Sequence, residues 1–172
     1  MMTKQQKTYE NYPWWIMVVS NAVTFMIYGI GMYIIAQLGI IPAALYLLYI
    51  IMLYVRLLTG SCSHCCYYGK CCAFGYGKIS ALLFKRKDAE SFADKKLTWK
   101  DLIPDLLVSL IPLIAGIILL LKNFSWLIVL LLALIVVLTT VGNSFVRGTL
   151  ACRFCRQREI GCPAEKLFNK KK

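Results

Sequence analysis

The sequence predicts an all-α, polytopic membrane protein with four transmembrane helices. We expect a parallel internal duplication of two-helix hairpins, with a cytosolic cysteine-rich cap. Three observations predict this fold: an apolar composition, four long apolar segments, and a cysteine motif that occurs twice. The 172 residues are 59% hydrophobic, with a mean hydropathy of +0.65. This is more apolar than an ordinary soluble domain, so we expect the chain in a lipid bilayer.

Four segments are long and apolar enough to be membrane spans. A helix needs about 20 mainly apolar residues to cross roughly 30 Å of hydrocarbon. The segments are Trp14 to Gln37, Ile41 to Leu58, Leu102 to Leu121 and Phe124 to Val146. The first is too long and too aromatic to be a signal peptide, so we treat it as a mature helix. Short connections at Gly39 and Asn123 predict tight turns that join the spans into two hairpins.

Positive charge lies on one side of the predicted membrane. The net charge is +12, and every one of the 20 Lys and Arg residues except Lys122 falls on the side that carries both chain ends. The positive-inside rule makes this side cytosolic. We therefore expect a multi-pass protein of the cell (inner or cytoplasmic) membrane with cytosolic N- and C-termini. Its basic surface should contact anionic lipid of the inner leaflet rather than nucleic acid. Its protein partners would be a larger membrane complex or further copies of itself.

A repeat of about 90 residues relates the two halves of the chain. Residues 1–72 hold the first hairpin and its cysteine motif, and residues 73–101 form an amphipathic cytosolic connector. Residues 102–172 hold the second hairpin, its cysteine motif and a basic tail. A parallel repeat of this kind packs about a pseudo-two-fold axis along the membrane normal, so the two motifs should face each other. In both motifs the spacing is C-x2-C-x6-C, formed by Cys62, Cys65 and Cys72, and by Cys152, Cys155 and Cys162.

These six cysteines are the candidate metal ligands. Structural disulfides are rare in the reducing cytosol, where closely spaced cysteines more often bind metal or perform redox chemistry. A C-x2-C turn presents two thiolates to one ion, and the third cysteine fills a third tetrahedral position. Each triad is therefore one ligand short. The deficit can be met by auxiliary ligands, for which the first half offers His64, Cys66 and Cys71. Alternatively the halves share ligands, because six thiolates with two bridging give each of two zinc ions four sulfurs.

The second motif, from Ala151 to Cys162, resembles the first half of the fungal binuclear zinc cluster. That family contains two C-x2-C-x6-C halves whose six cysteines bind two zinc ions. The resemblance covers only Cys62 to Cys72 and Cys152 to Cys162, and the membrane helices between them are foreign to the family. It implies that six cysteines at these spacings can form one compact dinuclear zinc cluster. It does not imply DNA binding.

Two other cysteine chemistries are open. An iron-sulfur cluster is one, because Cys162-Pro163 is similar to the Cys-Pro that ends many ferredoxin ligand runs, although the usual C-x2-C-x2-C is absent. Quinone-linked thiol redox is the other. Vitamin K epoxide reductases and bacterial disulfide-generating membrane enzymes are also four-helix proteins with C-x-x-C, but only that local motif is similar. No acid-base pair, nucleotide loop or nucleophile triad is evident, so the sequence does not predict an enzyme. A zinc centre would be structural or serve docking, whereas an iron-sulfur centre would carry electrons.

Charged residues also lie near the ends of the predicted spans. A carboxylate in lipid is costly and needs a partner or a function. Arginines end the second and fourth spans at comparable depth, so we expect ion pairs at the inner membrane interface. The residues concerned are Asp101, Asp105, Arg56 and Arg147.

Overall fold

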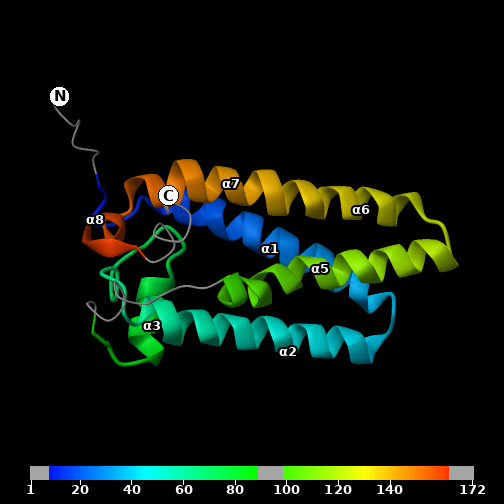
Figure 1. The fold of residues 1–172 in the computed structure, drawn as a ribbon, viewed down its shortest axis with the longest axis horizontal. Coiled ribbons are helices and arrows are strands. Elements are labelled where there is room, and N and C mark those ends of the chain that lie inside the picture. Colours follow the sequence, from blue (N-terminus) through cyan, green and yellow to red (C-terminus); the bar gives the residue numbers. More distant parts are fainter. Residues whose placement is uncertain (1–7, 89–98, 163–172) are drawn as a thin grey trace. The chain divides into compact units, whose positions relative to one another are not determined.

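The computed structural model describes residues 8–88 and 99–162, and its long helices follow the predicted spans (Figure 1). Four helical segments are long and apolar enough to cross a membrane. The prediction of an all-helical, four-span membrane protein is therefore confirmed. The long helices are α1 (Trp14–Ala36), α2 (Ile40–Leu57), α5 (Trp99–Lys122) and α6 (Trp126–Val137).

The fourth apolar segment extends further than predicted. Helical structure continues beyond α6, through two π-helical turns and the short α7 (Asn143–Phe145), so that the candidate span covers Trp126–Phe154. The second span likewise runs past α2, through the π-helical turn η1 (Leu58–Cys62). The second π-helical turn of the fourth span, η3 (Val146–Ala151), precedes Cys152. Each cysteine motif thus begins at a π-helical turn, a feature that often marks functional positions.

The described residues form two compact units, and each unit combines segments from both halves of the sequence. The helical unit contains residues 21–55 and 99–144. The cysteine unit contains residues 8–20, 56–88 and 145–162, and therefore holds both cysteine motifs. The boundary between the units falls inside two helices, since α1 and α2 each begin in one unit and end in the other.

The core of the helical unit draws on all four long helices. It consists of Ile34, Ile35, Tyr46, Leu53, Val108, Ala115 and Ile135. Ile34 and Ile135 are fully buried, whereas large apolar side chains on the outer faces are exposed, such as Ile40 at 86% and Leu121 at 84%. An apolar exterior around an apolar core is what a lipid-facing helix bundle requires, because lipid tails do not drive apolar side chains inward.

A tyrosine hydroxyl replaces a backbone hydrogen bond that a proline removes from α5. Pro112 has no N–H, so the carbonyl of Val108, four residues earlier, lacks its usual helical donor. The hydroxyl of Tyr46 donates to this carbonyl at 2.8 Å. Gly31 makes room for the contact, since a Cβ there would lie 2.6 Å from the Tyr46 hydroxyl oxygen. In hydrocarbon a freed carbonyl must find such a partner, so this bond fixes α2 against α5.

The cysteine unit is built from short elements. Besides the π-helical turns it contains α3 (Tyr76–Leu83), a 3-10 turn (Cys152–Phe154) and α8 (Gln157–Gly161). Its buried core consists of Tyr12, Ile16, Tyr67, Ala73 and Ala151. The core thus joins the start of α1 to both cysteine motifs.

Candidate thiol site in the cysteine unit

A reciprocal pair of hydrogen bonds joins the two cysteine motifs. The backbone N–H of Cys66 donates to Oε1 of Gln157 at 2.8 Å. The backbone N–H of Arg156 donates to the hydroxyl oxygen of Tyr67 at 3.1 Å. In the alignment that matches the six cysteines, Cys66 corresponds to Arg156 and Tyr67 to Gln157. Each motif therefore donates from one position and accepts at the next, the pattern expected of two segments related by a local two-fold axis.

The eight cysteines are all thiols, and the structure gathers both triads in the same unit. Cys65 and Cys72 lie near Cys62 within the first motif. Cys152 and Cys162 likewise lie near Cys155 within the second motif.

Two cysteines of the first motif lie near the second motif. Cys155 lies near Cys65, which holds the same place in the cysteine spacing of the first motif, and near Cys66. The side chains of Cys65, Cys66, Cys72 and Cys155 all pack against the core of the unit. The middle cysteine of each triad thus directly precedes a residue that donates one of the reciprocal hydrogen bonds.

The thiols do not adopt the geometry of a metal site in this structure. Within residues 8–88 and 99–162, no three Cys, His, Asp or Glu side chains converge closely enough to hold an ion. The proposed ligand sets and the cofactors zinc and iron-sulfur therefore stay predictions.

The three auxiliary donors named from the sequence have different surroundings. Nδ1 of His64 shares a hydrogen bond of 3.1 Å with the hydroxyl of Ser63, so this ring nitrogen already has a protein partner. Cys66 lies beside Cys65 and near Cys155. For Cys71 the structure records backbone bonds: its carbonyl accepts from the Tyr12 N–H at 2.9 Å, and its N–H donates to Oδ1 of Asn11 at 3.2 Å. Of the three, Cys66 is placed best to join a shared centre.

The environment shifts the thiol pKa values in opposite directions. The thiol of Cys65 donates a hydrogen bond to the sulfur of Cys66, which raises the pKa of Cys65 and lowers that of Cys66. Burial raises the pKa of Cys155 to about 12. A buried thiol resists ionisation because its anion loses hydration. A cation bound among these sulfurs would reverse that preference, since metal binding requires thiolates and releases protons.

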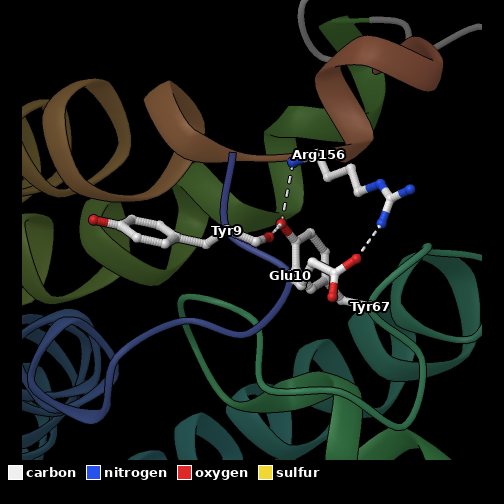
Figure 2. A network of polar contacts seen from close by, with 4 residues as sticks. All are labelled: Tyr9, Glu10, Tyr67 and Arg156. Carbon is white, nitrogen blue, oxygen red and sulfur yellow. Dashed lines mark hydrogen bonds and ion pairs between the residues drawn. The ribbon is translucent and has the colours of Figure 1, made fainter. Parts of the chain in front are cut away.

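An N-terminal arm, residues 9–12, is bonded to both motifs, and the sequence analysis missed it. Tyr9 forms an isolated parallel bridge with Cys155, and its N–H donates to the carbonyl of Phe154 at 3.1 Å. The hydroxyl of Tyr12 donates to the carbonyl of Ala151 at 2.5 Å. Figure 2 shows the hydroxyl of Tyr67 between the Tyr9 carbonyl, to which it donates, and the Arg156 N–H. The only sequence signal was a pair of tyrosines in a segment otherwise assigned no role.

Aromatic rings accompany these bonds. The ring of Tyr9 lies 5.4 Å from that of Tyr12 and 5.1 Å from that of Phe154. The ring of Tyr12 lies 5.6 Å from that of Tyr67. Tilted rings at such separations pack favourably and contribute beyond their buried area. Together they form an apolar layer beside the thiols, which agrees with the apolar surroundings that raise the pKa of Cys155.

An ion pair also connects the arm to the second motif. Nη1 of Arg156 lies 2.9 Å from Oε1 of Glu10 (Figure 2), but the two side chains are 48% and 71% exposed. Exposed pairs of this kind contribute little to stability. The tyrosine hydroxyls and the backbone hydrogen bonds, rather than the ion pair, hold the arm in place.

The ion pairs expected for Arg56 and Arg147 with Asp101 and Asp105 stay predictions. The arginines belong to the cysteine unit and the aspartates to the helical unit. Arg56, Arg147 and Asp105 are exposed, and Asp101 is half-buried. The rest of the connector and the basic tail, residues 89–98 and 163–172, lie outside the described residues.

No family model matches the chain, and searches of characterised proteins and of solved structures also give no match. The resemblance to the fungal zinc cluster stays one of cysteine spacing.

Proposed function

We propose that this integral membrane protein binds a binuclear zinc centre through its six repeated cysteines, and that the centre joins the two halves. The protein then serves as a structural and docking subunit of a membrane complex or of a homo-oligomer. Its cysteine unit faces the cytosol, as the distribution of positive charge favours. One observation carries the proposal: the reciprocal hydrogen bonds of Cys66 and Arg156, which support two cysteine motifs meeting face to face.

Ligand sharing follows from the donors available. Each triad supplies three sulfurs, and zinc in a structural site takes four ligands. In this proposal Cys65 and Cys155 are the bridging ligands. They hold the same place in the two cysteine spacings, they lie near each other, and each immediately precedes a residue of the reciprocal hydrogen bonds. Each of the remaining cysteines is then a ligand of only one of the two ions. These cysteines are Cys62, Cys72, Cys152 and Cys162.

The surroundings suit an anionic centre. Six thiolates outweigh the charge of two zinc ions, so the cluster carries net negative charge. Arg153, Arg156 and Arg158 lie within or beside the second motif. Arg156 also interacts with Cys66 in the direction that stabilises a thiolate. Arginine does not lose its proton in proteins, so these charges persist at every accessible pH.

Metal content of the full-length protein, purified without oxygen, tests the proposal. We expect a colourless protein with two zinc ions per chain by native mass spectrometry. Cys65→Ser and Cys155→Ser should each lose both ions, whereas Cys62→Ser should keep one. Cys71→Ser is the matched control and should keep both. A metal-free wild-type protein whose cysteine variants are as stable as the wild type would overturn the metal centre.

An iron-sulfur cluster is the second candidate, and Cys66 favours it. This residue adds a thiol near Cys65 and Cys155. The place where the two motifs meet therefore holds one more sulfur than the six that a zinc pair uses. Thiolates from short loops hold such clusters, and nearby cations raise their reduction potential. A brown protein containing iron and sulfide, bleached by Cys66→Ser, would select this alternative and an electron-carrying role.

A further inference from the structure

Helix α3 buries small residues and exposes large apolar ones, which is the reverse of a surface helix on a soluble protein. Its buried positions are the small residues Gly77 and Ser80. Its large apolar side chains point outward instead, with Leu82 at 85% exposed, Leu83 at 61% and Ile79 at 37%. A surface helix of a soluble protein would bury these three side chains. Their exposure marks a face that meets something apolar.

The buried face of α3 is fixed against the first cysteine motif. Ser80 Oγ donates to the carbonyl of Leu58 at 3.3 Å, and the Gly69 N–H donates to the carbonyl of Gly77 at 3.0 Å. A Cβ on Gly77 would lie only 2.1 Å from the backbone oxygen of Tyr67. Contacts this close leave no room for α3 to rotate and bury its leucines.

Three exposed cations follow the helix in a defined conformation. The chain is extended at Phe84, whose carbonyl accepts from the Tyr68 hydroxyl at 2.7 Å. The N–H of Lys87 donates to the carbonyl of Ser63 at 3.0 Å. Lys85, Arg86 and Lys87 are exposed, and they follow Leu83 closely in a segment whose backbone is bonded to the first cysteine motif. Lys78 adds an exposed cation on α3 itself, and Asp88 is the acidic residue that follows the triplet.

The contacts of α3 also indicate its depth. Leu58, which accepts from Ser80, and Ser63, which accepts from Lys87, lie at the end of the candidate span Ile40–Cys62. Eight residues of α-helix are about 12 Å long, far too short to cross a bilayer. An apolar face flanked by cations at the end of a span matches a helix lying in the membrane interface.

We propose that α3 and the basic triplet Lys85–Lys87 form an interfacial anchor for anionic phospholipid. Leu82 and Leu83 enter the boundary between headgroups and acyl chains, and the triplet binds the lipid phosphates. Charge complementarity selects this occupant, because a basic segment next to an apolar face is attracted to an anionic leaflet. The anchor does not require the metal centre, and so it stands independently of the proposed function.

Hydrogen–deuterium exchange on the full-length protein tests the anchor. The protein is placed in nanodiscs of phosphatidylcholine alone or of an equal mixture with phosphatidylglycerol. Amides of residues 79–87 should exchange about tenfold more slowly in the anionic nanodiscs, an effect that high salt should reduce. The triple variant Lys85→Gln, Arg86→Gln, Lys87→Gln should abolish the difference, whereas Lys70→Gln, an exposed cation outside the triplet, should preserve it.

Two outcomes would overturn the anchor. Equal exchange in both nanodiscs would remove the anionic-lipid contact. Protection that persists in Leu82→Asp, with unchanged exchange in α5 as the sign of an intact fold, would show that the leucine does not enter the lipid. The triple variant changes exposed side chains only, so loss of folding cannot explain its result.

Discussion

Replacing Tyr67 by Phe removes one oxygen atom and tests the hydrogen bonds that connect the two cysteine motifs. The ring of Tyr67 is 3% exposed, and Phe fills the same space, so the change leaves no cavity in the core. It removes a hydroxyl that accepts from the Arg156 N–H at 3.1 Å and donates to the carbonyl of Tyr9. The second motif and the N-terminal arm both lose a bond to the first motif.

The cost follows from these two bonds. Each net hydrogen bond is worth about 1 kcal/mol, and a donor or acceptor left without a partner away from water costs about 1–3 kcal/mol. We therefore expect Tyr67→Phe to lower the free energy of unfolding by about 2–3 kcal/mol. For a protein of this length, 1 kcal/mol corresponds to about 2–4 °C, so Tm should fall on the order of 5–10 °C.

Thermal unfolding of the protein in nanodiscs, followed by circular dichroism, measures this effect. It is recorded with and without a chelator, so that bound metal does not mask the change. Tyr33→Phe is the matched control, because its ring is 45% exposed on α1 and its Tm should not move. A Tm for Tyr67→Phe within 1 or 2 °C of the control, under both conditions, would refute the reasoning. The reciprocal hydrogen bonds would then contribute nothing to holding the motifs together.

Three further predictions address other features. Gly77→Ala should displace α3 and destabilise the protein by about 1–3 kcal/mol in a chemical unfolding experiment, whereas Gly148→Ala, with open space at its Cβ, should have little effect. Tyr46→Phe should cost about 1–2 kcal/mol in the same assay, since the α5 carbonyl it binds loses its donor in hydrocarbon; an unchanged stability would argue against that role. In metal-free protein near pH 8, iodoacetamide should modify Cys66 rather than Cys155, whose pKa of about 12 leaves on the order of a thousandfold less thiolate than an ordinary thiol. Modification of Cys155, read by peptide mass spectrometry, should rise as pH approaches 12, and equal labelling of both residues at pH 8 would contradict the assigned environments.

The sequence by itself determined the helices and their membrane character. Apolar segments of about 20 residues have few alternatives to spanning helices, because the backbone in hydrocarbon must satisfy its own hydrogen bonds. The starts of α1 at Trp14 and of α2 at Ile40 therefore agree with prediction to within one residue. The continuation of the fourth span to Phe154 was not foreseen, because π-helical turns have no simple sequence period.

Only the tertiary structure decided what lies between the two cysteine motifs. The spacing of the motifs identified the six cysteines. It contained no sign that Gln157 would accept a hydrogen bond from the Cys66 N–H, or Tyr67 one from the Arg156 N–H. The placement of Tyr9 beside Cys155 was equally invisible, because residues 146 positions apart meet only when the chain closes on itself. Local patterns report which face of a helix is apolar, whereas contacts between distant segments depend on how all elements pack at once.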